Sequence, residues 1–264
     1  MLHMSSDAES PLLSAVEGPP ARVLNARGTR RAVLVCEHAS RFIPAALSGL
    51  GLSPEAACSH SAWDIGAMDL AVELSGALDA PLVYSRVSRL VYDCNRPPER
   101  ADAMPAQSEI YTIPGNAELS PAQRTRRADA VYHPFRQLLS ATLDSRPAPL
   151  VLITLHSFTP VYQGRTRSVE LGILHDSDDR AARLLLTAAQ GSGLKAALNE
   201  PYSATDGVTH TLREHAIARG LPNVMIEVRN DLIDTPSGVN RITGLLAPML
   251  AGMIETLAPS GAQA

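Results

Sequence analysis

The feature that most constrains the fold is a set of short apolar runs that end in ionisable residues. The first, Ala32–Val35, leads past a cysteine into Glu37 and His38, and the plainest, Pro149–Leu155, leads into His156. Short runs that are apolar throughout are typical of parallel strands buried on both faces. In an open α/β sheet, the carboxyl ends of such strands form the crevice in which ligands bind. The sequence therefore predicts a site at the carboxyl edge of a parallel sheet.

Strand-like and helical stretches alternate along the rest of the chain. Further strands are expected at 81–84, 169–174 and 223–228, and helices at 61–78, 120–143, 178–190, 209–219 and 239–257. This alternation indicates a mostly parallel sheet with helices on both faces. We therefore expect a single three-layer α/β domain over residues 29–264, after a loose tail over residues 1–28. The polar stretch 99–116 is expected to be a long loop over one edge of the sheet.

Composition argues against several classes of protein. A chain of 264 residues with 45% hydrophobic content can bury a sizeable core, and a net charge of −4 disfavours a nucleic-acid or anionic membrane partner. Three cysteines without CxxC spacing disfavour a disulfide scaffold and fit a reducing compartment. The sequence contains neither an 18-residue apolar run nor a signal-peptide pattern. We expect a cytoplasmic protein without a membrane or nucleic-acid partner.

Two histidines and two carboxylates are candidates for the predicted edge. His38 and His156 follow strands, Asp64 is expected in the first turn of the 61–78 helix, and Glu227 lies in or at the end of the 223–228 strand. Two histidines and one carboxylate can supply the three protein ligands of a catalytic Zn²⁺, which keeps one position open for water. Such a metal lowers the pKa of its water to about 7 and polarises a carbonyl. Glu227 is suited to act as the general base.

Each of these residues also has a structural explanation. A single histidine near a strand end is most often a core or surface residue. Asp64 follows Ser61 by three positions, as in a capping box. Glu227 in an apolar strand needs a partner, which Arg89 or Arg229 could supply without any catalysis. The residues alone therefore leave both a metallohydrolase and a structural interpretation open.

Arginines form a second group of candidates. Arg89 and Arg96 lie in one polar stretch, with Asn95 beside Arg96, and Arg229 follows the last predicted strand. A guanidinium grips a carboxylate at two points, so this group could recognise an acidic small molecule. The alternative is that Arg89 and Asp93 pair with one another.

Seven motifs occur along the chain in a fixed order: C-E-H-A-S-R-F-I-P, A-W-D-I-G-A, S-R-L-V-Y-D-C-N-R-P, I-P-G-N, L-H-S-F-T-P, N-E-P-Y and I-E-V-R-N-D-L-I. In this order they resemble the N-formylglutamate amidohydrolase family, over roughly residues 33–257. The resemblance implies an α/β fold similar to that of the zinc carboxypeptidases. It also implies hydrolysis of N-formyl-L-glutamate to L-glutamate and formate, at the end of one histidine degradation route.

The resemblance further implies roles for individual residues. His38 and His156 would be zinc ligands, with Asp64 as the third ligand. Glu227 would be the general base and later the general acid. The carboxylates of the formylated amino acid would be bound by Arg89, Asn95, Arg96 and Arg229.

The third ligand departs from the carboxypeptidase pattern, which has a glutamate three residues after the first histidine. Arg41 stands at that position here, so Asp64 or Glu37 must replace the glutamate. Asp64 is preferred, because the adjacent Glu37 and His38 point to opposite sides of an extended strand. Two other functions stay open, namely an amidohydrolase for another N-acyl amino acid or a small peptide, and a non-catalytic binder of an acidic small molecule. The sequence sets no oligomeric state.

Overall fold

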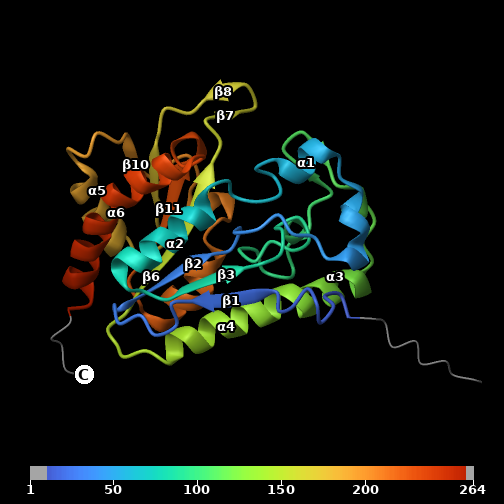
Figure 1. The fold of residues 1–264 in the computed structure, drawn as a ribbon, viewed down its shortest axis with the longest axis horizontal. Coiled ribbons are helices and arrows are strands. Elements are labelled where there is room, and N and C mark those ends of the chain that lie inside the picture. Colours follow the sequence, from blue (N-terminus) through green and yellow to red (C-terminus); the bar gives the residue numbers. More distant parts are fainter. Residues whose placement is uncertain (1–10, 260–264) are drawn as a thin grey trace, which may run out of the picture.

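A seven-stranded sheet forms the centre of the fold. The computed structural model describes residues 11–259, and within them the sheet has the order β1-β3-β2-β6-β11-β9-β10 (Figure 1). Its strands are β1 (Ala21–Leu24), β2 (Ala32–Cys36), β3 (Leu82–Ser85), β6 (Val151–Phe158), β9 (Leu171–Leu174), β10 (Ala196–Leu198) and β11 (Asn223–Arg229). Neighbouring strands are parallel except in the pairs β1–β3 and β9–β11. The predicted mostly parallel sheet is confirmed.

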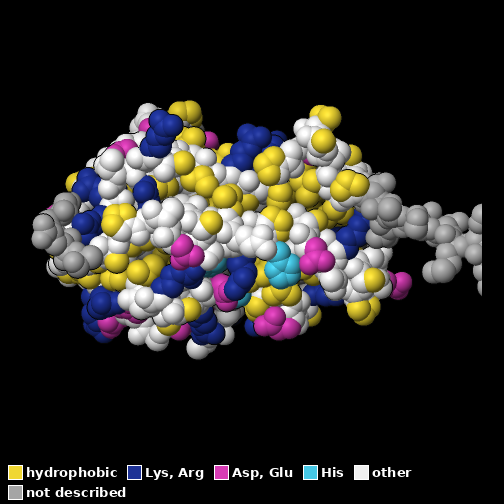
Figure 2. Space-filling model, turned by 90° about the horizontal axis from the view of Figure 1, so that it is seen from below, with side chains coloured by type: hydrophobic (Ala, Val, Ile, Leu, Met, Phe, Trp, Pro, Cys, Tyr) yellow, Lys and Arg dark blue, Asp and Glu magenta, His cyan; other side chains and the backbone are white. Residues whose placement is uncertain are grey.

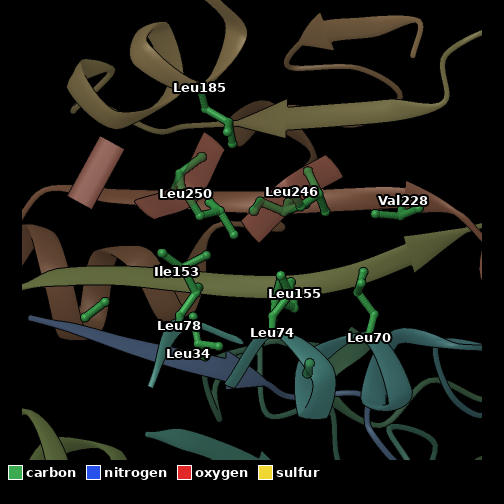
Figure 3. Close-up of a cluster of buried hydrophobic side chains, with 14 of the residues drawn as sticks. Leu34, Leu70, Leu74, Leu78, Ile153, Leu155, Leu185, Val228, Leu246 and Leu250 are labelled. Carbon is green, nitrogen blue, oxygen red and sulfur yellow. The ribbon is translucent and has the colours of Figure 1, made fainter. Parts of the chain in front are cut away.

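Three helices pack on one face of the sheet: α2 (Ala67–Leu78), α5 (Arg180–Ala189) and α6 (Pro236–Leu257). Leu70, Leu74 and Leu78 recur at helical spacing along α2. They lie on the same side of the sheet as Ile153 and Leu155 of β6 (Figure 3). Two strand residues separated by one position share a face, which is why Ile153 and Leu155 both point toward α2. The burial of these side chains makes this layer the larger part of the core.

The alternate strand residues point to the opposite face of the sheet. Leu152 of β6 and Met225 of β11 pack there with Phe135 and Leu139 of α4 (His133–Asp144). Because both faces of these strands are covered, their sequences are apolar throughout rather than alternating. The expected three-layer arrangement is therefore confirmed.

The helix expected at 61–78 begins later, at Ala67. Gly66 precedes it with a φ of +76°, and a Cβ at this position would lie 2.2 Å from the carbonyl oxygen of Ile233. Only glycine fits such a conformation and such a close approach. Asp64 therefore lies in the turn before α2, not in its first turn as predicted. The Asp64 N–H donates to the His38 carbonyl oxygen at 3.0 Å, which fixes the turn beside the end of β2.

Two other predicted helices are interrupted. The stretch 120–143 divides into α3 (Pro121–Arg127), a π-helical segment (Ala128–Tyr132) and α4. Pro134 has no N–H to continue the α-helical pattern, which accounts for the break. The stretch 209–219 consists mainly of a π-helical segment (Leu212–Ala216) and a 3₁₀ turn (Ile217–Arg219). It ends, as predicted, at Gly220, which has a φ of +67°.

Strand β1 corrects the predicted tail. It lies within residues 1–28 but pairs with β3 at the sheet edge, so the loose segment does not extend to residue 28. Residues 1–10 of that predicted tail lie outside the described residues.

Two small hairpins project from the loops, β4 (Gln107–Ser108) with β5 (Tyr111–Thr112) and β7 (Val161–Tyr162) with β8 (Arg165–Thr166). The first of them lies in the predicted loop 99–116. The remaining elements are α1 (Pro54–Cys58) and 3₁₀ turns at Ala45–Gly51, Ala101–Ala103, Pro114–Asn116, Ala204–Asp206 and Asn230–Leu232.

On the face shown in Figure 2, acidic, basic and apolar side chains are interspersed. Within residues 11–259, no helix has both the length and the apolar character needed to cross a membrane.

Candidate functional site

A pocket of about 180 Å³ lies at the carboxyl edge of the sheet, beside β2, β6 and β11. Its wall combines strand ends with residues from both hairpins and from three loops. The residues that line it are His38, His60, Ser61, Asp64, Arg89, Asn95, Arg96, Ser108, Glu109, His156, Ser157, Tyr162, Tyr202, Val208 and Glu227. All of the predicted site residues except Arg229 are among them.

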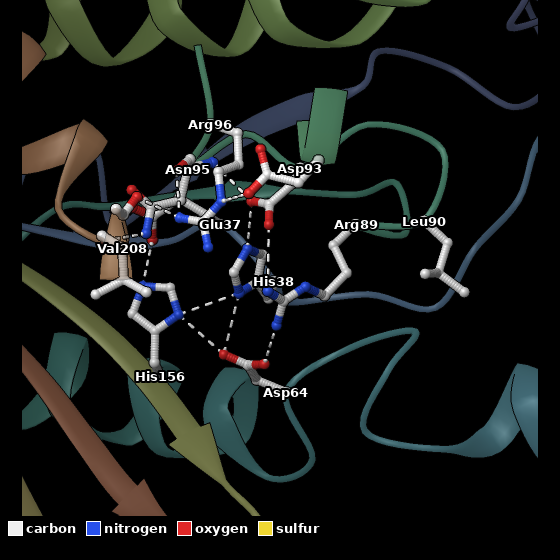
Figure 4. Close-up of polar contacts among 12 residues, drawn as sticks. Glu37, His38, Asp64, Arg89, Leu90, Asp93, Asn95, Arg96, His156 and Val208 are labelled. Atoms are coloured by element: carbon white, nitrogen blue, oxygen red, sulfur yellow. Dashed lines mark hydrogen bonds and ion pairs between the residues drawn. The ribbon is translucent and has the colours of Figure 1, made fainter. Parts of the chain in front are cut away.

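Three side-chain atoms that could bind a metal converge in this pocket (Figure 4). His38 Nδ1 lies 3.2 Å from His156 Nδ1 and 3.2 Å from Asp64 Oδ2, and His156 Nδ1 lies 2.9 Å from Asp64 Oδ2. Ligand atoms about 2.0–2.1 Å from a tetrahedral Zn²⁺ are themselves about 3.3 Å apart. The spacing and the donor types both fit such an ion, so His38, Asp64 and His156 could hold a metal.

A carboxylate lies behind each of the two imidazoles. His38 Nε2 is 2.7 Å from Asp93 Oδ1, and His156 Nε2 is 3.1 Å from Glu37 Oε2. Metal-binding histidines commonly have such a partner on the second nitrogen, because it fixes the tautomer and the ring orientation. The structure thereby places Asp64 with the ligand atoms, and Glu37 behind His156 instead.

The electrostatics of the three residues favour added positive charge. Burial by itself lowers the pKa of His156, but Glu37 and Asp64 outweigh it and raise that pKa well above its ordinary value. The pKa of His38 is also raised, since Asp93 and Asp64 outweigh burial and the charge of Arg89. A buried cluster that stabilises protonated imidazoles in this way also suits a cation bound between them.

Glu227 approaches the same point from the neighbouring strand. In the parallel pairing of β11 with β6, it lies opposite His156. Its side chain is 5% exposed, and within residues 11–259 no donor meets its Oε2. Burial is the main reason that its pKa rises to about 7, and the Asp64 charge adds to the rise. A carboxyl group that titrates near neutral pH is suited to general acid–base chemistry.

Arg89 forms an ion pair with Asp93 and also lines the pocket. Its Nη1 donates to Asp64 Oδ1 and its Nη2 to Asp93 Oδ2, each at 3.2 Å. The expected Arg89–Asp93 pair is thus present, but the side chain also remains 25% exposed and lines the pocket. Arg89 links the two carboxylates that contact His38.

The Asn95 and Arg96 side chains are held by the protein. The Asn95 amide donates to the Val208 carbonyl oxygen and accepts from the Thr211 N–H. Arg96 donates to the Gly207 carbonyl oxygen and lies 3.3 Å from Asp102 Oδ2. Both residues line the pocket, so they connect its wall to the 207–211 segment.

Arg229 does not line the pocket, contrary to its predicted role. Its Nε donates to Asp231 Oδ1 at 2.8 Å and its Nη2 to Glu170 Oε1 at 3.4 Å. These acidic partners hold the guanidinium at the end of β11. Its Nη1 donates to the backbone carbonyl oxygen of Arg167 at 3.3 Å.

Three contributors were given no site role from the sequence. Asp93 was considered only as a partner for Arg89. His60 Nδ1 lies 3.7 Å from Asp64 Oδ1, and burial lowers the His60 pKa to about 4. Tyr202 lines the pocket from the N-E-P-Y motif, which carried part of the family resemblance. That motif was the one signal that could have identified Tyr202.

The fold and the site together define an α/β protein with a buried group of two histidines and one aspartate at the carboxyl edge of its sheet. A family model described as N-formylglutamate amidohydrolase matches residues 30–234. The chain therefore belongs to the N-formylglutamate amidohydrolase family, a family of hydrolases, which confirms the resemblance in the sequence.

Two solved structures show how far the likeness extends. Gene product Atu2144 from Agrobacterium tumefaciens is 49% identical, with a TM-score of 0.90 over 93% of this chain and 98% of that chain. N-formylglutamate amidohydrolase from Ralstonia eutropha JMP134 is 16% identical, with a TM-score of 0.63 over 90% of this chain and 98% of that chain. At that identity the second protein shows a shared fold. No curated protein matches the chain.

Proposed function

We propose that this protein is a zinc-dependent amidohydrolase that cleaves N-formyl-L-glutamate to L-glutamate and formate. One observation carries the proposal. A pocket at the carboxyl edge of the sheet holds three converging atoms that could bind a metal, from His38, Asp64 and His156. Beside them lies Glu227, whose Oε2 meets no donor within residues 11–259. Family membership supports the reaction class and the substrate.

His38, Asp64 and His156 would hold the metal, with Asp93 and Glu37 fixing the two imidazole rings from behind. When bound, a zinc ion lowers the pKa of a water molecule and polarises a carbonyl oxygen. Burial of the three ligands keeps bulk water from competing with these interactions.

Glu227 would move the proton. Its carboxylate takes a proton from the water whose oxygen attacks the formyl carbon. The resulting carboxylic acid then gives the proton to the amide nitrogen as the C–N bond breaks. This releases the free amine and formic acid, whose remaining proton passes to solvent or to the amine to give formate. A pKa of about 7 lets one group perform both transfers near neutral pH.

Arg89 and Arg96 would face the acidic substrate from the pocket wall, and Asn95 would support them through its bonds to the 208–211 segment. Arg229 has no part in this assignment, because its guanidinium is engaged outside the pocket.

The deciding experiment measures the metal content of the purified protein and then formate release from N-formyl-L-glutamate, before and after chelation. About one zinc per chain with chelator-sensitive formate release would support the proposal. Zinc without turnover would keep the metal site but exclude this substrate, and a panel of other N-acyl amino acids and small peptides would follow. If the protein holds no metal and gains no activity when metal is added, the proposal fails and a non-catalytic binder of an acidic small molecule becomes the favoured function.

A further inference from the structure

The arginines around the pocket differ in whether a protein carboxylate neutralises them. Arg89 pairs with two aspartates, Arg96 with Asp102, and Arg229 with Glu170 and Asp231. In the part of the chain that the structure describes, Arg167 has no carboxylate at ion-pair distance. It follows the β7–β8 hairpin, and its charge is the one in this group that no described carboxylate offsets.

Aromatic rings of the pocket fix the Arg167 guanidinium. Its central carbon lies 4.6 Å from the ring centroid of Tyr162 and 4.9 Å from that of Tyr202, and both rings line the pocket. The ring of Phe158, at the end of β6, is 5.5 Å away. Such contacts hold a cation by its flat faces and leave its N–H edges available.

Hydrogen bonds engage part of that edge. Nη1 donates to the carbonyl and hydroxyl oxygens of Thr159, and Nη2 donates to the Tyr202 hydroxyl oxygen at 3.1 Å. These three bonds account for three of the five guanidinium hydrogens. Because the Tyr202 oxygen accepts from Arg167, the phenolic hydrogen of Tyr202 can be donated to a ligand.

Arg167 does not itself line the pocket, but it lies directly behind Tyr162 and Tyr202, whose rings do. Burial, with the Glu227 charge, raises the pKa of Tyr202 to about 12, so its hydroxyl keeps its hydrogen at neutral pH. A fixed cation beside a hydroxyl donor complements a carboxylate.

We propose that Tyr202 and Arg167 bind the side-chain carboxylate of the substrate and select an N-acyl acidic amino acid over its neutral analogue. Arg89 contacts Asp64 directly and so lies nearer the reacting amide and the α-carboxylate. Arg167 contacts none of the three ligand residues and takes the more distant carboxylate. This inference depends on the proposed function for the identity of the substrate.

The test compares N-formyl-L-glutamate with N-formyl-L-glutamine, which differs only at the side-chain carboxylate. In Arg167→Gln, we expect kcat/KM for the glutamate substrate to fall about 10- to 100-fold, with a change of less than about threefold for the glutamine substrate. Arg167→Lys keeps the charge and should restore part of the selectivity. Tyr202→Phe removes the hydroxyl alone and should give a smaller loss of the same kind. Arg165→Gln, an exposed change in the adjoining strand β8, is the matched control.

An equal fall for both substrates, or no fall for either, would overturn this assignment. Failure of the proposed function gives a different result, because the wild-type protein would then hydrolyse neither substrate. In that case calorimetric titration with L-glutamate and L-glutamine decides the inference. Tighter binding of glutamate by the wild type, lost in Arg167→Gln and kept in Arg165→Gln, supports it. Equal binding of the two amino acids by the wild type refutes it.

Discussion

The carboxyl groups on two sides of the pocket have pKa values shifted in opposite directions. On the β2–β6 side, Glu37, Asp64 and Asp93 each face a histidine, which outweighs the effect of burial and keeps their pKa values below the ordinary range. On the β11 side, Glu227 is also buried, but no donor among residues 11–259 meets its Oε2, and its pKa rises to about 7. The first arrangement keeps carboxylates charged and fixed. The second keeps one carboxyl group able to gain and lose a proton.

The largest effect on activity is expected from Glu227→Gln, which keeps the shape of the side chain but removes its basicity. We expect kcat to fall about 10²- to 10⁴-fold, the usual contribution of a general acid–base residue, with the metal content unchanged. In the wild type, kcat should decline as the pH falls through the pKa of Glu227, because the carboxylate then becomes protonated and can no longer act as the base. Steady-state formate release and metal analysis measure both effects.

Glu73→Gln on the exposed surface of α2 is the control for this change and should retain wild-type turnover. Wild-type kcat in Glu227→Gln would exclude Glu227 as the base.

The paired side can be weakened without removing a ligand. Glu37→Gln takes away the charge behind His156 but leaves all three ligand residues in place. We expect zinc affinity to fall about 10- to 100-fold, as for other partners of metal-binding histidines. Competition with a chelator of known affinity measures the change. A larger loss in Glu37→Gln than in Asp64→Asn would instead indicate that Glu37 is the third ligand.

The smallest expected effect concerns the free energy of unfolding, which Glu227 should lower as the pH rises. In the metal-free protein, the folded state raises the pKa of Glu227 from an ordinary value of 4.5 to about 7. Above pH 4.5 the unfolded chain loses this proton before the folded chain does, so Glu227 lowers the free energy of unfolding progressively up to about pH 7. The penalty is then constant, at about 3 kcal/mol.

Glu227→Gln should therefore be more stable than the metal-free wild type at pH 8, and this advantage should diminish toward pH 4.5. Denaturant unfolding at several pH values measures the difference. An advantage that does not change with pH would show that Glu227 ionisation is not its cause.

Much of this fold follows from local sequence pattern, because strands buried on both faces must be apolar throughout. That pattern placed β2, β6 and β11, and the carboxyl edge of a parallel sheet then brought Glu37, His38 and His156 together. The start of α2 could not be predicted, since it depends on the contact of Gly66 with Ile233.

The rest of the site depends on contacts between distant segments. Asp93 and Tyr202 reach the pocket from loops, and the conformation of a loop cannot be predicted from a periodic sequence pattern. Arg229 has a suitable charge and position in the sequence, but Glu170, 59 residues away, holds its guanidinium elsewhere. Arg167 lies in a stretch without strand or helix periodicity. It becomes a candidate only through its contacts with the rings of three residues that the fold brings around it.

The hydrogen bond from the Asp64 N–H to the His38 carbonyl oxygen also bears on how such a pocket can diversify. It joins the two ends of the 25-residue segment 39–63. This segment contains the 3₁₀ turn Ala45–Gly51, helix α1 and two residues of the pocket wall, His60 and Ser61. Because this segment is closed at its base, changes at its exposed positions leave His38 and Asp64 joined, whereas Leu50, Ala56 and Ala62 within it are buried in the core. Evolution or protein engineering can therefore reshape this part of the wall, and with it the range of substrates, without rebuilding the reactive centre.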